Sequence, residues 1–553
     1  MIISIFLILL ASGFLLPLVS CRSGGKAVSF ALLLVLLALF GWFCGCWADG
    51  ANEPFVIHWL RYNDLYVDVN LSSVPENYRL IFPVFAVSVS AALIAVFGSE
   101  ENSGSRLVGS IFLNLAALML LICSDNLIQL AVSSAMAGVT GFYLINDLEA
   151  RSRYSYYNLL ADMGLFTVFA VIYGHLGNLD LSELGRFEQD GAHRDLVAVL
   201  LLLSVFLKSG LFPFHNQLVG LSAVSFNRLN VISWVSTPLS GVIILSKTLP
   251  LLSVSEYSVP MLQIFAVLTM VWAFGAGLII DNIKERAVYF NLMIYAYIYA
   301  LVSLNDFDVG FRLAYFVLAG YLLSAVFYMV FVASSNELFV SKMGNFFRSL
   351  KFTFLLSLAA FVLFFRIVLS GMEPLNQPWS MALLTFAVMF GAHFLHQAYW
   401  GAPNADERVA ALLKNPSWYV WLPLLAIMFL LAVSENGWHL PVAYAGAALL
   451  LFTFADPFCR LERLAEYEAL QDEDYFEKVF ELLLLTPIRI FGRILWLLVD
   501  FILIERTIIN SLNDGTAFLV KTASKLNASA VWSGVVLSLA GLVAMVVYFY
   551  VRG

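Results

Sequence analysis

The sequence predicts an all-α integral membrane protein with about sixteen transmembrane helices. Of its 553 residues, 61% are hydrophobic and 12% are charged, which leaves too little polar surface for soluble domains. Uninterrupted apolar runs of about 18 to 25 residues recur along the chain, and a helix needs that length to cross about 30 Å of hydrocarbon. The runs lack the strict alternation of a lipid-facing barrel strand, and only a helix satisfies its own backbone hydrogen bonds in lipid.

The apolar runs follow one another in order from the first residues to the last. They predict spans at residues 2–20, 27–47, 79–98, 106–124, 126–146, 155–174, 196–214, 220–246, 259–280, 286–304, 312–333, 352–370, 380–400, 417–434, 439–457 and 530–550. The first run ends at Ser20-Cys21 and is similar in outline to a lipoprotein export signal. Because Met1 to Ser4 include no Lys or Arg, we expect a first transmembrane helix instead.

The segment between the last two predicted spans has a different character. It is acidic from Asp472 to Asp474, and charged residues from Arg489 to Lys521 are then spaced between apolar ones. This segment is too polar to cross a membrane. Its apolar positions recur at about the helical period, which is typical of an amphipathic helix that lies along a membrane or a neighbouring protein.

Lysine and arginine are distributed unevenly between the two sets of loops. The loops after odd-numbered spans carry about twelve of them, roughly twice as many as the loops on the other side. Because positive loops stay inside, we expect the N-terminus outside and the amphipathic segment on the cytoplasmic or matrix face. Two longer acidic loops, near 48–78 and 175–195, are then expected on the opposite face.

The sequence carries none of the usual motifs of soluble enzymes. It has no glycine-rich phosphate loop, no Cys-x-x-Cys pair, no Gly-x-Ser-x-Gly and no basic stripe for nucleic acid. The five cysteines show neither a paired framework nor a histidine at ligand spacing, so we expect inert packing residues rather than a disulfide or a metal site. They are Cys21, Cys44, Cys46, Cys123 and Cys459.

One charged residue lies in the middle of a predicted span. Lys208 precedes the helix-breaking Pro213 by five residues and His215 by seven, which indicates a broken helix that carries an amine. An ionisable residue within a span costs free energy and is a functional candidate. A dehydrated amine near an acid can load and release a proton as its surroundings change. The alternative is a lysine that extends to the membrane interface, and the residues alone leave both open.

The residues around Lys208 resemble a family signature. The run Lys208-Ser209-x-x-Phe212-Pro213-Phe214-His215-x-x-Leu218 is similar to Lys-Ser-Ala-Gln-Phe-Pro-Phe-His-Thr-Trp-Leu in the antiporter-like subunits of respiratory complex I and of multisubunit Na+/H+ antiporters. Asn158 to Gly164 resembles the family's Asn-Arg-Val-Gly-Asp-Val-Gly, and Asn282-Ile283-Lys284 resembles a segment that opens a later helix. Sixteen spans with an amphipathic segment before the last is the layout of the largest such subunit, named L in bacteria and 5 in mitochondria.

The resemblance implies a division of the chain. Two inverted five-helix repeats would each contain a broken helix, and the amphipathic segment would be a lateral helix that braces neighbouring subunits. The implied parts are N-terminal transmembrane helices at 1–105, a first antiporter-like bundle at 106–250, a second one at 251–400, C-terminal transmembrane helices at 401–460, the lateral helix at 461–528 and a final span at 529–553.

The resemblance also implies a proton path through four residues. Lys208 would be its central amine, Asp162 the acid beside it, His215 a group just beyond the helix break, and Lys284 the entry to a later helix. Each has a simpler alternative. Asp162 would otherwise cap a helix or pair with a loop arginine, His215 would be hydrogen-bonded at a helix end, and Lys284 would anchor its helix at the interface.

Several proton-carrier positions of the family hold residues here that cannot carry a proton. Aligned without gaps, the family's glutamate of the fifth span falls on Ala135, and the histidine of the eighth falls on Ser233. In the second bundle, the family's two histidines and lysine fall on Leu318, Leu322 and Val326, and a further lysine falls near Leu375. Polar residues elsewhere are candidates to replace them. These are Arg228, Lys247, Arg366, His393 and His396.

The sequence therefore favours a membrane subunit of a proton-translocating NADH–quinone oxidoreductase, in a bacterial or mitochondrial inner membrane. We expect no cofactor and no metal, since no motif for NADH or an iron–sulfur cluster is present. The expected partners are the lipid bilayer and other membrane subunits, and not nucleic acid. Two alternatives stay open: a scaffold copy that no longer conducts, and a subunit of a multisubunit Na+/H+ antiporter or a related ion-coupled uptake system.

Overall fold

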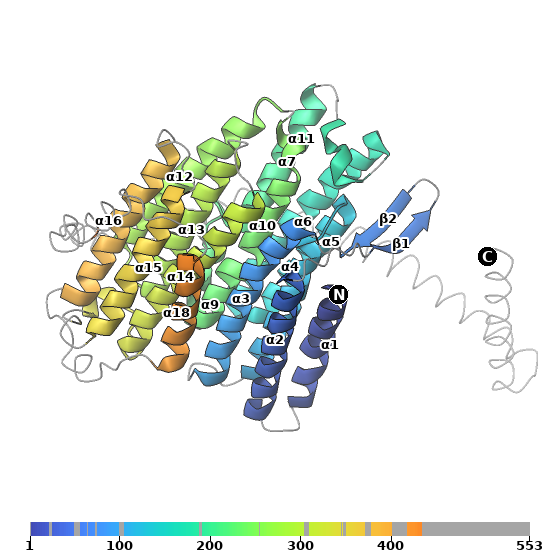
Figure 1. Cartoon of the computed structure of the whole chain (residues 1–553). Helices are drawn as coiled ribbons and strands as arrows, with labels where there is room; N and C mark the ends of the chain where they lie inside the picture. The colour runs from blue at the N-terminus through green and yellow to red at the C-terminus, as the bar shows by residue number, and fades with distance from the viewer. Residues whose placement is uncertain are drawn as a thin grey trace, which may run out of the picture. The chain divides into compact units, whose positions relative to one another are not determined.

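The computed structural model describes one helical unit of this chain (Figure 1). Contacts divide the chain into Met1–Gln471 and Asp472–Gly553, and all described residues belong to the first unit. The described residues are 2–433 and 449, without 21–24, 49–55, 63–64, 72–73, 99–103, 178, 187–190, 254, 304–308, 344–345, 347–349, 371–377 and 401–416. The spans predicted at 439–457 and 530–550 and the predicted lateral helix at 461–528 lie outside this part.

Fourteen of the sixteen predicted spans fall on helices of the described part. The long helices are α1 (Ile2–Ser20), α2 (Gly25–Ala48), α3 (Pro75–Phe97), α4 (Gly104–Ile122), α5 (Leu127–Leu144), α6 (Leu148–Leu176), α7 (Gly191–Ser209), α9 (Phe226–Val235), α10 (Thr237–Lys247), α12 (Ser258–Ile279), α13 (Ile283–Val302), α14 (Val309–Ala333), α15 (Lys351–Ser370), α16 (Pro378–Trp400) and α18 (Trp418–Val433). Short helical turns are η1 (Leu181–Arg186), α8 (Asn216–Val219), η2 (Gly220–Ala223), α11 (Leu249–Ser253) and η3 (Val340–Lys342). Within the described residues, nine helical stretches are long and apolar enough to cross a membrane, and the chain is a multi-pass membrane protein.

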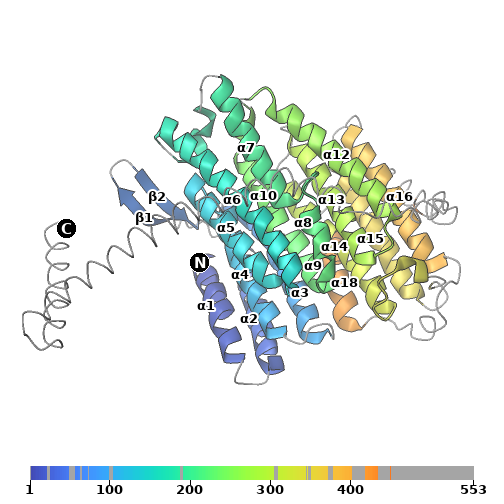
Figure 2. The same ribbon diagram turned by 180° about the vertical axis from the view of Figure 1, so that it is seen from behind.

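The helices pack side by side, and their order across the unit largely follows the sequence. Helices α1 and α2 lie at one side, and α15 and α16 lie at the other, in both views (Figures 1 and 2). Helix α18 departs from this order and packs against α14 and α3, where the rings of Trp418 and Phe97 are 4.8 Å apart. Helix α14 and the α9–α10 pair are buried on almost every side, whereas α6 and α12 expose large apolar side chains such as Met163 and Ile264, as expected of lipid-facing helices.

The loop predicted near 48–78 contains a β-hairpin, an exception to the all-α prediction. Strands β1 (Val56–Tyr62) and β2 (Leu65–Asn70) pair antiparallel. The hairpin attaches to the start of α5, because the Asn70 N–H donates to Gln129 Oε1 (2.9 Å) and Gln129 Nε2 donates to the Asn70 carbonyl (2.8 Å). An isolated two-stranded hairpin is only marginally stable in water, so this hairpin depends on its contact with α5. The local sequence does not show that contact, which is why the hairpin was not predicted.

Two helices begin in the same way and support an internal repeat. Asp125-Asn126 precedes α5 and Asp281-Asn282 precedes α13, and each asparagine side chain accepts a hydrogen bond from its helix's first turn. Each start also exchanges two backbone hydrogen bonds with a distant segment. They are Leu127 N to Leu179 O (2.9 Å) and Leu181 N to Asp125 O (3.0 Å) in the first copy, and Ile283 N to Leu338 O (2.9 Å) and Val340 N to Asp281 O (3.0 Å) in the second. Because α5 and α13 are the fifth and tenth predicted spans, the two copies are inverted.

The first helix break lies directly after Lys208. Gly210 adopts a left-handed conformation (φ 65°), and the Leu211 N–H donates to the carbonyl of Phe206 (3.1 Å), which ends α7 at Ser209 in a Schellman motif. A cis peptide bond between Phe212 and Pro213 follows, and then the short helix α8. The expected broken helix is confirmed, and the span predicted at 196–214 is five residues shorter at its end.

A second break lies within the span predicted at 220–246, which the structure has as the apolar stretch Phe226–Lys247. Helix α9 ends before Ser236, whose backbone is neither helical nor extended (φ −141°, ψ −140°), and α10 begins with Thr237-Pro238. Proline has no N–H, so Pro238 cannot donate the backbone hydrogen bond that would continue α9. It also disfavours a helical conformation in the residue before it. Buried side chains bind the carbonyls beside the break: Tyr295 Oη donates to Ser233 O (2.6 Å), and Asn114 Nδ2 donates to Val235 O.

Candidate functional site

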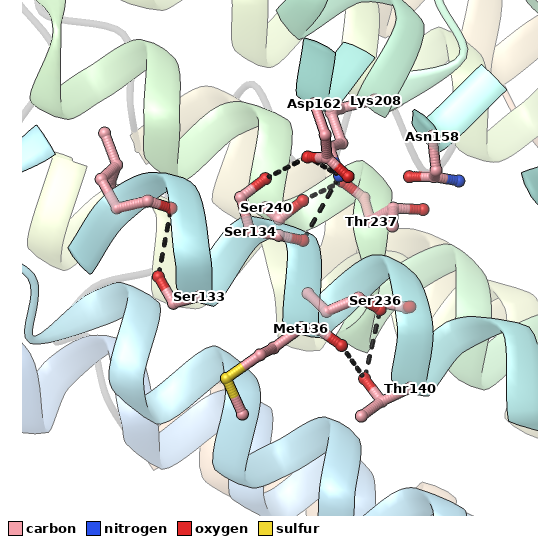
Figure 3. A network of polar contacts seen from close by, with 12 residues as sticks. Ser133, Ser134, Met136, Thr140, Asn158, Asp162, Lys208, Ser236, Thr237 and Ser240 are labelled. Atoms are coloured by element: carbon pink, nitrogen blue, oxygen red, sulfur yellow. Dashed lines mark hydrogen bonds and ion pairs between the residues drawn. The ribbon is translucent and has the colours of Figure 1, made fainter. Parts of the chain in front are cut away.

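A buried ion pair lies at the break of α7. Lys208 Nζ is 2.7 Å from Asp162 Oδ1 on α6 and donates to the carbonyl of Ser134 on α5 (3.3 Å) (Figure 3). The Lys208 side chain is fully buried, and that of Asp162 is 14% exposed. Removing one partner of a buried ion pair leaves an uncompensated charge at a cost of about 3–5 kcal/mol. The ion pair therefore links α7 to α6, and the hydrogen bond to Ser134 adds α5.

Polar groups of α5, α6 and α10 surround this ion pair. Ser134 Oγ donates to Asp162 Oδ1 (3.4 Å), so α5 contributes a hydroxyl and a carbonyl. Gly138 of α5 lies beside both Lys208 and Asn158. A methyl group added there would be 3.5 Å from Lys208 Nζ and 3.6 Å from Asn158 Oδ1, so the Asn158 amide lies near the Lys208 amine. Asn158 Oδ1 and Thr237 Oγ1 are buried and accept or donate no hydrogen bond within the described part. Buried polar atoms of this kind are usual binding sites for water.

Ser209 links the same turn of α7 to two further helices. Its hydroxyl donates to the Pro238 carbonyl of α10 (3.0 Å) and contacts the Tyr299 hydroxyl of α13. A Cβ at Gly241 would overlap Ser209 Oγ and lie 3.0 Å from Tyr299 Oη, so α10 approaches this pair closely. Our sequence reading missed this contact. The available signal was Tyr295 and Tyr299 at one-turn spacing in an apolar run.

His215 has a separate set of contacts, with α12. Its Nε2 accepts a hydrogen bond from Trp272 Nε1 (3.1 Å), and its ring stacks on that of Phe212 at 5.8 Å. An imidazole nitrogen that accepts from an indole carries no proton of its own. These contacts connect the α7–α8 break to α12.

Lys284 lies at the start of α13, where its contacts resemble those of an anchor. Its Nζ donates to the Val224 carbonyl after η2 (2.7 Å) and lies 5.9 Å from the centre of the Phe331 ring. Of the four site residues predicted from the sequence, the structure brings together Lys208 and Asp162. His215 and Lys284 each attach the first bundle to a helix of the second.

Comparisons with known proteins give weak but consistent similarity, and no family model matches the chain. NADH-quinone oxidoreductase subunit L of Campylobacter jejuni is 22% identical over 352 residues, which cover 61% of this chain and 58% of that protein. NADH-ubiquinone oxidoreductase chain 5 of Paramecium tetraurelia is 22% identical over 375 residues (64% and 61%). A Staphylococcus haemolyticus protein that is named as an antiporter subunit is 21% identical over 266 residues (46% and 33%). The chain thus spans about three-fifths of the first two relatives.

Solved structures share the fold. A chain in the Mrp complex from Dietzia sp. superposes with a TM-score of 0.69 at 16% identity, over 99% of this chain and 66% of that one. A chain of the archaeal membrane-bound sulfane sulfur reductase gives a TM-score of 0.58 at 16% identity, over 77% and 74%. This chain is a divergent homologue of the antiporter-like membrane subunits.

This antiporter-like chain obtains the acid of its ion pair from α6. Ala135 of α5, where the sequence resemblance puts the family's glutamate, has no carboxylate, and the neighbouring Ser134 contacts Lys208 and Asp162. In the second bundle, Leu318, Leu322 and Val326 of α14 are all buried, at 4%, 0% and 0% exposure. The position near Leu375 lies outside the described residues.

Two of the candidate replacement residues bind ends of helices. Arg228 Nη1 donates to the carbonyl of Leu144 at the end of α5 (2.7 Å), and Lys247 Nζ donates to the carbonyl of Ser124 just before α5 (2.6 Å). Within the described residues no group of three or more His, Cys, Asp or Glu could hold a metal ion.

Proposed function

We propose that this chain is the proton-translocating membrane subunit of a respiratory complex of the NADH–quinone oxidoreductase type, and that Lys208 and Asp162 carry the proton. The observation that carries the proposal is the 2.7 Å ion pair, fully buried at the lysine, at a helix break. The relatives named as subunit L and chain 5 supply the type of complex.

The proposed step is a proton transfer controlled by the separation of the two charges. While the pair is closed, the carboxylate and the Ser134 carbonyl stabilise the ammonium. If α7 moves away from α6, each group becomes an isolated buried charge, which costs several kcal/mol. Proton release from the amine removes the part of that cost that falls on Lys208, and proton uptake by the carboxylate removes the part that falls on Asp162. The turn at Gly210 ends α7 directly after Ser209, so the lysine lies in the last turn of the helix, next to the break.

The partners belong to the proposal. Because the named relatives are subunits of larger complexes, we propose that this chain assembles with other membrane subunits and that movement of those subunits separates the pair. We also propose a bacterial or mitochondrial inner membrane, with the N-terminus outside and the segment at 461–528 on the cytoplasmic or matrix side, from the distribution of Lys and Arg.

The test is proton translocation by the purified complex in proteoliposomes. Lys208→Ala is expected to abolish translocation that depends on this chain. Lys342→Ala is the matched control, because Lys342 is an exposed lysine whose ammonium lies over the Phe339 ring at 4.6 Å, and it should leave the rate unchanged. An unchanged rate with Lys208→Ala in a folded complex would refute the proton-carrying role.

A second candidate is a subunit of a multisubunit cation/proton antiporter, favoured by the Mrp superposition over 99% of this chain. A third is a scaffold that does not conduct, favoured by the buried apolar residues Leu318, Leu322 and Val326 at carrier positions. Identification of the proteins that co-purify with the tagged chain separates the first two candidates, because quinone-reducing subunits are expected for one and antiporter subunits for the other. The Lys208→Ala assay identifies the scaffold, for which both variants would behave like the unmodified chain.

A further inference from the structure

Several buried polar atoms in and beside the first bundle have no described hydrogen bond. Seven of the residues that carry them lie on α6, α8, α9, α10 and α13. These residues are Asn158, Gln217, Asn227, Asn230, Ser233, Thr237 and Asn291. Because a buried polar group without a partner costs about 1–3 kcal/mol, ordered water is the usual partner, and this half of the interior is suited to hold it.

The second bundle contains a cluster of buried aromatic rings beside its buried polar residues, among them Arg286, His393 and Gln397. Phenylalanine side chains from α13, α14, α15 and α16 meet there, and each is at most 1% exposed. The members of this phenylalanine cluster are Phe290, Phe327, Phe361, Phe364, Phe390 and Phe394. Ring centres lie 4.3 Å apart for Phe327 and Phe394, 5.2 Å for Phe290 and Phe390, and 6.0 Å for Phe290 and Phe361.

The cluster is packed tightly against the backbone of two helices. A Cβ at Gly391 of α16 would lie 2.6 Å from Phe361 Cε1, and a Cβ at Gly277 of α12 would overlap the Phe390 ring. Leu322 and Val326, on the same helix as Phe327, are fully buried. A water molecule needs space and two to four polar partners, and these ring faces and aliphatic side chains provide neither.

We propose that the phenylalanine cluster is a dry seal across the second bundle, so that water and ions pass through the first bundle alone. A constriction lined by apolar side chains excludes water and therefore ions, which would lose their hydration without compensation. Which ion the seal blocks depends on the proposed function. The exclusion of water by the cluster does not depend on it. With the second bundle sealed, a proton bound at Lys208 enters and leaves through helices α5 to α10.

The first test measures water access by cysteine substitution in the assembled complex. The five native cysteines are replaced by alanine, and single cysteines are then placed at Asn230 or Ser233 in the first bundle and at Phe327 or Phe364 in the cluster. The probe is a small water-soluble methanethiosulfonate, added from either side of the membrane. We expect the first-bundle thiols to react at least about tenfold faster than the cluster thiols, as a dry cluster requires. Similar rates at Ser233→Cys and Phe327→Cys would overturn the proposal.

The second test opens the seal. In proteoliposomes, the double variant Phe327→Ser and Phe390→Ser should raise the passive proton leak several-fold, because two hydroxyls and the lost ring volume admit water. Phe429→Ser is the control, since Phe429 is 68% exposed on α18. An unchanged leak in a folded double variant would also overturn the seal. Neither thiol reactivity nor passive leak requires Lys208, so a failure of the proposed function leaves both readouts intact.

Discussion

Asp162→Asn tests whether the ion pair stabilises the first bundle as its geometry requires. The substitution keeps the size of the side chain and removes its charge, while Lys208 stays fully buried. At 2.7 Å, two unit charges attract by about 6 kcal/mol at an effective dielectric constant near 20. Desolvation offsets part of this attraction, and measured costs of breaking a buried pair are about 3–5 kcal/mol. We expect the free energy of unfolding to fall by an amount in that range.

The assay is a double-mutant cycle with Lys208→Met, in which unfolding is followed by denaturant titration in mixed micelles. Each single variant leaves one buried charge, whereas the double variant leaves none, so the double variant should be more stable than the sum of the single changes predicts. A coupling energy of about 2 kcal/mol or more is expected, which is within the usual range for residues in contact. Strict additivity would show that the two side chains do not form this pair in the folded protein.

Two further substitutions test the packing around the site. Gly391→Ala should lower the free energy of unfolding by about 1–3 kcal/mol, because its methyl group would overlap the Phe361 ring. Gly45→Ala is the control, since a methyl group there faces open space and should leave the stability unchanged. Equal effects of the two substitutions on thermal unfolding would contradict the tight packing at Gly391. Trp272→Phe removes the indole N–H that donates a hydrogen bond to His215 Nε2. The free energy of unfolding should fall by about 1–3 kcal/mol, and proton translocation should not change. Loss of translocation at normal stability would instead assign His215 to the proton path.

Hydropathy predicted most of the fold because span length and apolar composition are local properties. The break near Pro213 was also predictable, since a glycine and a proline lie within five residues of Lys208. The break at Ser236 also had a signal in Pro238, which our sequence analysis did not use. Its free carbonyls are satisfied by side chains from distant helices, among them Tyr295, and only the folded structure shows those partners.

The candidate site was predictable in part for a similar reason. Lys208 was identified as a charge within an apolar run, whereas Asp162, and its place beside Lys208, were expected only through the family resemblance. The phenylalanine cluster gave no signal in the sequence, since phenylalanines such as Phe290 and Phe327 are common in any span. Which rings meet depends on how four helices pack, and that information is absent from each helix alone.

The position of Lys208 in the last turn of α7 has an electrostatic consequence. The carbonyl groups at a helix C-terminus carry a partial negative charge equivalent to about half an electron, concentrated within the final turn. The ammonium is therefore attracted both by the Asp162 carboxylate and by the dipole of its own helix. When Asp162 takes up a proton and becomes neutral, the dipole remains, so this end of α7 keeps an affinity for a cation throughout a proton-transfer cycle.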